Sequence, residues 1–364
     1  MLKSIKQYDK QYSKLLGIFN PYETFPYKLD REIPKFDIVA YHSNPKYQFV
    51  YDKLFIAKSQ SMACGTLKET QDATYPIFIK PRYGHLSASS KNCYKIASEE
   101  ELKPFKRKKN MMWSEFVNAK ESMTDFILIN GEIVYQITYI YSEKQNGFSD
   151  DWKYISPENK PPEEIVDWVK RHMVHYSGPC NVQYRSTKII EVGLRFARGG
   201  MYIESTHNKK LIQAINNSYK NDVWNYKDES DLHFKPFYSF KCWSPIPIVC
   251  LMPQYFVDAI MKSYNCMPFY EYYFEPTGKR SIIFFQLLHE DFEKGMQAKK
   301  VLEWCMLFLS TVVLLCIAFS IYLFVMKNKY NYAFYILVIL YMLSLLNSLD
   351  ILIHQFVNQK QFLF

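Results

Sequence analysis

The sequence predicts an α+β domain with largely antiparallel sheets, followed by a two-helix membrane hairpin at the C-terminus. Short runs that alternate between apolar and polar residues predict strands, and the amphipathic stretches between them predict helices. Two long uncharged apolar runs near the end of the chain predict the membrane hairpin. At 364 residues the chain has room for a large domain besides these spans.

The elements expected in the first half follow one another with short connections. They are an irregular lead-in with one helix over 1–45, a helix within 46–65, a strand at 75–81, a small-residue loop at 84–90, a strand at 93–96, a helix from 98, a strand pair over 125–141 and a helix at 161–176. Asn130-Gly131 between alternating apolar residues is a strong hairpin signal. Proline in the first turn supports the helix at 161–176.

The second half is less regular. The polar stretch 142–160 is expected to be a linker. Beyond Gly200 we expect helices at 208–220 and 253–265, strands within 233–250, and a strand followed by a helix over 281–298.

A second hairpin carries the polar groups that point to chemistry. The runs NVQYR and IIEVGLR alternate and are separated by Ser-Thr-Lys. With these three residues as the loop, Gln183 lies opposite Glu191, and Asn181 lies opposite Gly193. Amide and carboxylate oxygens then share a face with Arg195, an arrangement that suits a hard divalent cation beside an anion such as a nucleoside triphosphate. An ordinary hairpin with a polar solvent face has the same spacing.

The C-terminal runs, 304–326 and 332–349, each lack charge over about the length that crosses a bilayer, roughly 20 residues. The connector of five residues suits a tight turn at the membrane surface, so we expect a multi-pass membrane protein with two spans and lipid as a partner. A buried helix pair in a soluble core is the alternative. The lysine distribution and the absence of a signal peptide predict that the N-terminal domain and the C-terminus are cytosolic.

Cysteine spacing and charge argue against a zinc-knuckle protein and against a nucleic-acid-binding protein. The eight cysteines are scattered without the close spacing of a zinc knuckle, so we expect free thiols in a reducing compartment. The net charge is +9, but the one dense basic run, KPFKRKK, is expected to be a solvated loop, and contact with anionic headgroups or phosphates is the alternative. We expect no nucleic-acid partner. The histidines show no ligand spacing.

The order of the motifs resembles the ATP-grasp enzymes, in particular the ATP-binding halves of carbamoyl phosphate synthetase and related carboxylate–amine ligases. The resemblance is strongest over residues 46–220, within an expected domain of 46–298. The matching motifs are Asp52-Lys53, Lys80-Pro81, the loop Gly84 to Ser90, Glu115 with Phe116 and Val117, Glu121, and the closing segment with Gln183, Glu191, Arg195 and Arg198.

The resemblance implies two α+β subdomains that grip ATP and Mg²⁺ between them. The cofactor-binding residues that it implies are Lys53, Lys80, Ser87 and Ser89 for the phosphates, Glu115, Phe116 and Val117 for adenine, and Glu121 for ribose. It implies Gln183 and Glu191 as metal ligands, and Arg195 and Lys80 as catalytic residues. The activity it implies joins a carboxylate to an amine through an acyl phosphate. The sequence does not identify those two substrates or the oligomeric state.

One position departs from the family pattern. Gly193 stands where the family usually has an asparagine that completes the metal site, so either Asn181 across the hairpin replaces that ligand or one metal site is lost. The alternative function is therefore a catalytically degenerate scaffold that serves as a membrane-anchored structural or interaction protein. The tyrosine, lysine and asparagine usage resembles proteins of large DNA viruses, which suggests a virion or host membrane as the destination.

Overall fold

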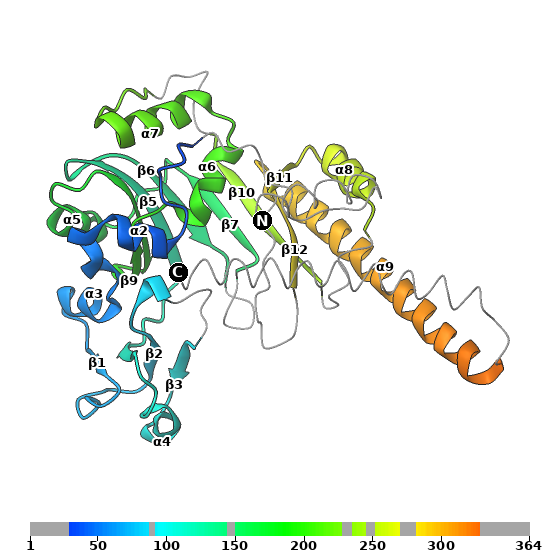
Figure 1. Ribbon diagram of the computed structural model, residues 1–364, viewed down its shortest axis with the longest axis horizontal. Coiled ribbons are helices and arrows are strands. Elements are labelled where there is room, and N and C mark those ends of the chain that lie inside the picture. The colour runs from blue at the N-terminus through cyan, green and yellow to red at the C-terminus, as the bar shows by residue number, and fades with distance from the viewer. Residues whose placement is uncertain are drawn as a thin grey trace. The chain divides into compact units, whose positions relative to one another are not determined.

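The structure is a computed structural model that describes residues 29–86, 92–143, 150–227, 235–244, 252–269 and 282–327. The chain divides into two compact units. The N-terminal unit spans Pro26–Phe237, and the C-terminal unit contains the described residues from Tyr238 onward. Each unit combines helices with antiparallel sheet, as the sequence predicts (Figure 1).

A small antiparallel sheet forms one part of the N-terminal unit. Its strands lie in the order β1 (Cys64–Thr66), β4 (Met111–Glu115), β2 (Ile77–Pro81) and β3 (Tyr94–Ile96). The side chains of Ile77 and Ile79 in β2 are fully buried and pack in one cluster with Leu102 of α4 (Glu99–Leu102). The hydroxyl of Ser98 caps α4 by accepting from the amide of Glu101. Short 3-10 helices follow β2 and α4, η2 (Gly84–Leu86) and η3 (Lys103–Phe105).

A larger antiparallel sheet forms the rest of this unit. Its strands lie in the order β7 (Trp152–Ser156), β6 (Glu132–Tyr141), β5 (Glu121–Ile129), β8 (Gly178–Arg185) and β9 (Lys188–Gly193). The predicted turn between β5 and β6 is confirmed: Asn130 and Gly131 have φ of +49° and +86°, the left-handed region that this dipeptide favours. The predicted linker at 142–160 is wrong because it contains β7. Its Lys153 is buried in an ion pair with Asp150 at 3.3 Å, which made the stretch look polar.

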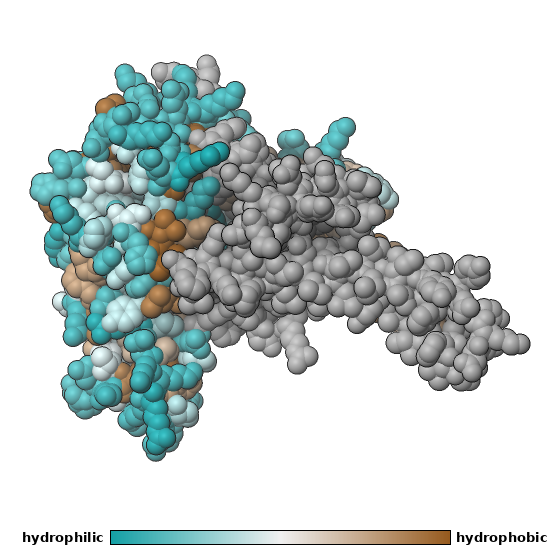
Figure 2. All heavy atoms as spheres, in the orientation of Figure 1, coloured by the Kyte–Doolittle hydropathy of each residue, from teal (hydrophilic) through white to brown (hydrophobic). Residues whose placement is uncertain are grey.

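Helices cover one face of the larger sheet. They are α2 (Asp37–Ser43), η1 (Pro45–Tyr51), α3 (Lys53–Ser59) and α5 (Glu163–His172). Trp168 and Val169 of α5 share a buried cluster with Phe126 of β5 and Val182 of β8. After β9 come η4 (Ala197–Gly200), α6 (Met201–Ser205) and α7 (Lys209–Asn221). The visible surface of this unit is mostly hydrophilic, with small apolar patches (Figure 2).

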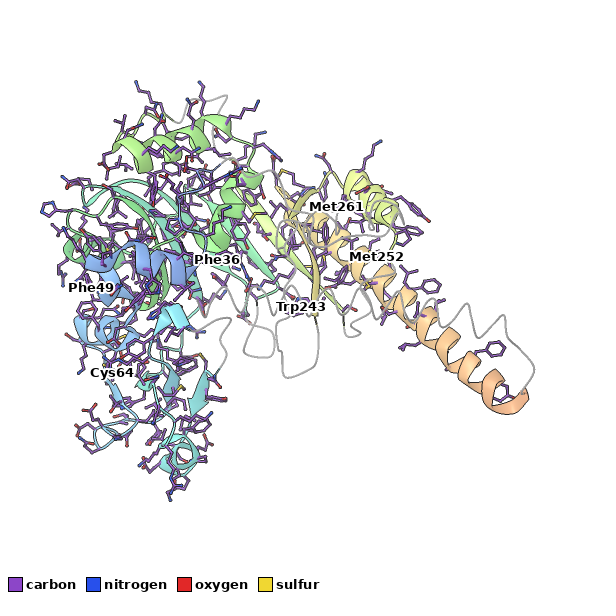
Figure 3. The ribbon with its side chains drawn as sticks, viewed as in Figure 1. Phe36, Phe49, Cys64, Trp243, Met252 and Met261 are labelled. Atoms are coloured by element: carbon purple, nitrogen blue, oxygen red, sulfur yellow. The ribbon has the colours of Figure 1, made fainter. Side chains whose placement is uncertain are left out.

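The C-terminal unit contains strands in the order β10 (Phe237–Ser244), β12 (Ile282–His289) and β11 (Met267–Phe269), with helices α8 (Gln254–Ser263) and α9 (Phe292–Lys327). Met261 of α8 is buried (Figure 3). The first turns of α9 bury Ala298, Leu302 and Met306. The strand and helix predicted over 281–298 are confirmed as β12 and the start of α9, and this helix continues without a break through residue 304.

The membrane hairpin is the part of the prediction that the structure does not support. The first candidate span, 304–326, lies within α9. Among the described residues, no helix combines the length and the apolar character needed to cross a bilayer. The second candidate, 332–349, lies outside the described residues.

Replacing Gly295 by alanine is expected to destabilise the C-terminal unit. A Cβ on this α9 residue would lie 2.2 Å from Cε2 of Phe240, a fully buried ring of β10. Overpacking of this kind costs about 1–3 kcal/mol, which exceeds the gain of about 1 kcal/mol in helix propensity. Urea unfolding measures the effect, with exposed Lys300→Ala as the control on the same helix. Equal free energies of unfolding for Gly295→Ala and wild type would refute this packing account.

Candidate nucleotide and metal site

The hairpin of β8 and β9 contains the two cross-strand pairs that the sequence predicts. Gln183 pairs with Glu191, and Asn181 pairs with Gly193. The predicted three-residue loop is wrong, because Arg185 pairs with Lys188 and the turn is two residues long. The register shifts by one residue between Gln183 and Tyr184, so Ile190 bulges from β9. The shorter turn and the bulge offset each other, which leaves both predicted pairs in place.

Lys80 of β2 reaches this bulge from the small sheet. Its Nζ donates to the carbonyl oxygen of Ile190 at 2.9 Å, and the side chain is 7% exposed. Burial, together with the nearby charge of Lys53, lowers the pKa of Lys80 to about 8, and the charge of Glu191 opposes the shift. The predicted Lys80-Pro81 strand end therefore lies directly beside the predicted metal-binding hairpin.

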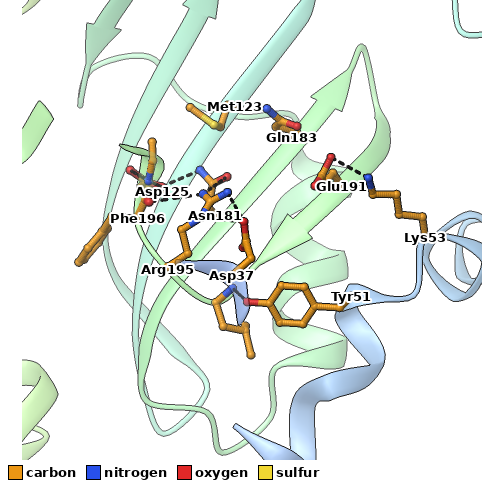
Figure 4. Close-up of polar contacts among 12 residues, drawn as sticks. Asp37, Tyr51, Lys53, Met123, Asp125, Asn181, Gln183, Glu191, Arg195 and Phe196 are labelled. Carbon is orange, nitrogen blue, oxygen red and sulfur yellow. Dashed lines mark hydrogen bonds and ion pairs between the residues drawn. The ribbon is translucent and has the colours of Figure 1, made fainter. Parts of the chain in front are cut away.

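Lys53 approaches the same point from the helical side. The carboxylate of Asp52 caps α3 by accepting from the amide of Leu54 at 3.0 Å, and it also accepts from Nε of Arg82 at 2.8 Å. This cap fixes the start of α3, so that the buried Lys53 Nζ lies 3.1 Å from Oε2 of Glu191 (Figure 4). The structure thus brings together Lys53, Lys80 and Glu191 from three separate motifs.

Gly84, where the predicted phosphate loop begins, also lies at this point. A Cβ on Gly84 would be 3.6 Å from both Oε1 of Glu191 and Cε of Lys53. The backbone therefore passes close to the ion pair, which is what a loop that covers phosphates requires. Ser87 and Ser89, the predicted phosphate-binding serines, lie outside the described residues.

The segment between β4 and β5 connects the two sheets of the N-terminal unit, as expected for an adenine hinge. The amide of Glu115 donates to the carbonyl oxygen of Ala63 at 2.8 Å, and Nζ of Lys95 lies 4.3 Å from the ring centre of Phe116. Val117 packs in a cluster with Met112.

Glu121, the predicted ribose contact, is the first residue of β5. It is 8% exposed and pairs with Nη2 of Arg185 at 3.1 Å. Nη1 of Arg185 also donates to the carbonyl oxygen of Val117 at 3.4 Å. Arg185 therefore links the end of the hinge to the predicted ribose residue.

Arg195 lies in a network of carboxylates and amides. Its Nε and Nη2 donate to Oδ2 of Asp37 at 3.2 and 2.8 Å, and its Nη1 donates to Oδ1 of Asn181 at 3.3 Å. Asn181 is 4% exposed, and its Nδ2 donates to Oδ1 of Asp125 at 2.7 Å (Figure 4). Arg195 thus forms an ion pair with Asp37, and Asn181 is held between Arg195 and Asp125.

Asp37 and Asp125 belong to this network, although the sequence did not identify them. Asp125 accepts from Tyr139 Oη at 2.6 Å and from the amide of Ala197 at 2.9 Å, and burial raises its pKa to about 6. Asp125 of β5 lies directly opposite Asn181 of β8, and a prediction of this strand pairing could have identified Asp125. No sequence signal marks Asp37, which lies 158 residues before its partner Arg195.

The donors present fit a divalent cation bound together with phosphates. Nε2 of Gln183 donates to Tyr141 Oη at 3.3 Å, which leaves its Oε1 without a hydrogen bond in the described part of the chain. Gln183 and the one-third-exposed Glu191 then offer neutral and anionic oxygens side by side. The described residues contain no cluster of three or more His, Cys, Asp or Glu side chains that could hold a metal. Such a pair suits Mg²⁺, which usually takes one or two protein carboxylates and completes its shell with water and phosphate.

Comparison with known proteins finds likeness in structure rather than in sequence. No family model matches the chain, and no curated protein matches it. Among solved structures, it is similar to an L-amino acid ligase from Bacillus licheniformis, with a TM-score of 0.47 and 14% identity, covering 73% of this chain and 72% of that chain. It is also similar to the N5-carboxyaminoimidazole ribonucleotide synthetase from Thermus thermophilus, with a TM-score of 0.47 and 11% identity, covering 71% of this chain and 76% of that chain. A third similar structure is an Aspergillus clavatus N5-carboxyaminoimidazole synthase in complex with ADP and an aminoimidazole ribonucleotide. Its TM-score is 0.46 and its identity 10%, covering 69% of this chain and 71% of that chain.

Proposed function

We propose that this chain binds Mg-ATP in the manner of an ATP-grasp protein and uses it to join a carboxylate to an amine. The observation that carries the proposal is the convergence of Lys53 and Lys80 on the hairpin that presents Gln183 and Glu191. Two buried ammonium groups beside one carboxylate favour an added anion. A polyphosphate with Mg²⁺ supplies that anion and also a cation for Glu191.

Each of these residues has a physical task in the proposed reaction. Lys53 and Lys80 donate to phosphate oxygens, while Gln183 and Glu191 hold the metal. Mg²⁺ neutralises charge on the transferred group when it is bound. A substrate carboxylate oxygen attacks the γ-phosphorus as ADP leaves, and the amine then displaces phosphate from the acyl carbon. Arg195 lies on the same sheet face, where its guanidinium stabilises negative charge near the reacting groups.

A nucleotide-binding scaffold without chemistry is the second candidate, and Gly193 favours it because glycine supplies no side-chain ligand. ADP release separates the two candidates. The purified chain is incubated with Mg-ATP and a panel of amino acids and small peptides. The ligase proposal predicts ADP formation that needs both a carboxylate and an amine. Nucleotide binding without ADP release from any pair would support the scaffold.

The affinity for Mg-ATP is expected to fall above pH 8. The pKa of Lys80 is about 8 in the folded chain, below its ordinary value of 10.5. The buried ammonium group therefore destabilises the folded state, with its full cost present below pH 8. This cost is relieved as the pH rises from 8 to 10.5. Phosphate favours the charged form, so binding takes up a proton in that range and weakens by about tenfold per pH unit. Calorimetry in buffers of different ionisation enthalpy measures the proton uptake. Lys80→Arg, which stays charged, should remove the pH dependence, and an unchanged dependence would assign it to another group.

A further inference from the structure

Gly193 and Asp37 together suggest how this chain completes its metal site. We propose that the carboxylate of Asp37 provides the second metal ligand that residue 193 does not supply. The inference rests on the proposed Mg-ATP site. It adds a residue from α2, which is far from the hairpin in the sequence but lies beside it in the structure. The metal would then lie between the carboxylates of Glu191 and Asp37. Asp37 would take the place of the asparagine amide that the family usually has at position 193.

The space beside Gly193 is filled by Asp37. A Cβ on Gly193 would lie 2.6 Å from Oδ1 of Asp37, closer than real contacts allow. Any side chain at 193 would therefore displace this carboxylate. The oxygen of Asp37 stands where a side chain at 193 would begin, on the face of β9 that also carries Glu191, two residues earlier.

The two oxygens of Asp37 have different surroundings. Oδ2 accepts from Nε and Nη2 of Arg195, which fixes the carboxylate in place. Oδ1, the oxygen next to Gly193, accepts no hydrogen bond from the described residues, and the side chain is 19% exposed. One oxygen is thus anchored, and the other is available to a cation.

Asp37 and Glu191 place two carboxylates near the same face of β9. Burial raises the pKa of Asp37, the charge of Arg195 opposes this shift, and the weaker effect of the Glu191 charge adds to it. A divalent cation bound beside both carboxylates would offset the repulsion between their negative charges. Lys53 offsets part of this repulsion at Glu191 in the free chain.

Asn181 fits the role less well than Asp37 does. Both polar atoms of its amide are hydrogen-bonded, because Nδ2 donates to Asp125 and Oδ1 accepts from Arg195. The side chain is 4% exposed. Binding a metal through Asn181 would require breaking its contact with Arg195. Asp37 can bind through Oδ1 while Oδ2 keeps both of its bonds.

The test moves the proposed metal-binding side chain from position 37 to position 193. Four proteins are compared with wild type: Asp37→Ala, Asp37→Asn, Gly193→Asn, and the double variant Asp37→Ala with Gly193→Asn. The readouts are the number of Mn²⁺ ions bound per chain with ATP, counted by electron paramagnetic resonance, and the Mg²⁺ concentration that gives half of the ATP-dependent thermal shift. Thermal unfolding without ligand reports whether each variant is folded.

Asp37→Ala is expected to lose one bound Mn²⁺ and to raise the half-saturating Mg²⁺ concentration by about tenfold or more. Gly193→Asn should weaken metal binding similarly, because its side chain collides with Asp37. The double variant, with room for an asparagine at 193, should regain the ion. Asp37→Asn keeps a bond to Arg195 without the charge, so it should fold normally and still bind Mg²⁺ more weakly.

Two outcomes overturn the inference and are distinguishable from failure of the proposed function. If wild type needs Mg²⁺ for ATP binding but Asp37→Asn and Asp37→Ala retain its metal count and Mg²⁺ dependence, Asp37 is not a ligand. If the folded double variant stays as weak as Asp37→Ala, Asp37 acts by holding Arg195 instead. Wild type that shows no Mg²⁺-dependent ATP binding would remove the proposed function and this inference together.

Discussion

Lys80→Ala is expected to abolish most of the thermal stabilisation that Mg-ATP gives to the wild-type chain. Lys80 is buried, and its Nζ faces the bulge of β9 beside Lys53 and Glu191. A charge-assisted bond to phosphate in this setting is worth about 3 kcal/mol, or roughly a 100-fold change in affinity. At a ligand concentration about 100 times the wild-type Kd, the stabilisation should therefore drop from about 2.7 to about 0.4 kcal/mol.

Lys58→Ala is the matched control for this experiment. Lys58 lies on α3 with Lys53, but its side chain is exposed, so its removal changes the net charge by the same amount outside the site. Melting curves with and without Mg-ATP should be indistinguishable from wild type for this variant. A Lys80→Ala protein that kept the full Mg-ATP shift would show that the nucleotide does not bind at the bulge.

Asp125→Ala is expected to destabilise the N-terminal unit by about 3–5 kcal/mol. The substitution leaves Tyr139 Oη, Asn181 Nδ2 and the amide of Ala197 without their shared acceptor in the interior. Each unsatisfied buried donor costs about 1–3 kcal/mol, and partial rearrangement reduces the sum. The large effect follows because one carboxylate ties β5, β6, β8 and η4 together.

Urea unfolding measures this loss, and Asp167→Ala provides the comparison. Asp167 is exposed on α5, so its removal should change the free energy of unfolding by less than about 0.5 kcal/mol. Equal stabilities for the two variants would mean that water or a rearranged side chain satisfies the three donors. Asp125 would then have no structural importance beyond its volume.

The hairpin shows how much of the site could be predicted from the sequence. Alternation along β8 and β9 indicates which side chains share a face, but the Gln183–Glu191 pair was predicted with a three-residue loop and is present because the bulge offsets the shorter turn. The bulge at Ile190 did not follow from the pattern, because a bulge leaves the alternation on either side intact and is a property of two paired strands. Its carbonyl oxygen is nevertheless what Lys80 binds in the structure.

The network around Arg195 illustrates what sequence could not supply. Asp125 begins an apolar run, and such a position reads as the exposed start of a strand, whereas the structure buries it. Asp37 lies in a segment without clear periodicity, and only the folded arrangement brings it against Gly193. A missing side chain at 193 therefore looked like a lost ligand in the sequence, but in space the position is occupied.

Equilibrium binding of ATP to the wild-type chain, measured by calorimetry with Mg²⁺ and again with EDTA, tests the central claim most directly. The convergence of Lys53, Lys80, Gln183 and Glu191 predicts one ATP per chain in Mg²⁺ and strongly weakened binding in EDTA. Absence of binding in both conditions, or equal binding in both, would contradict the assignment of this hairpin as a metal–nucleotide site.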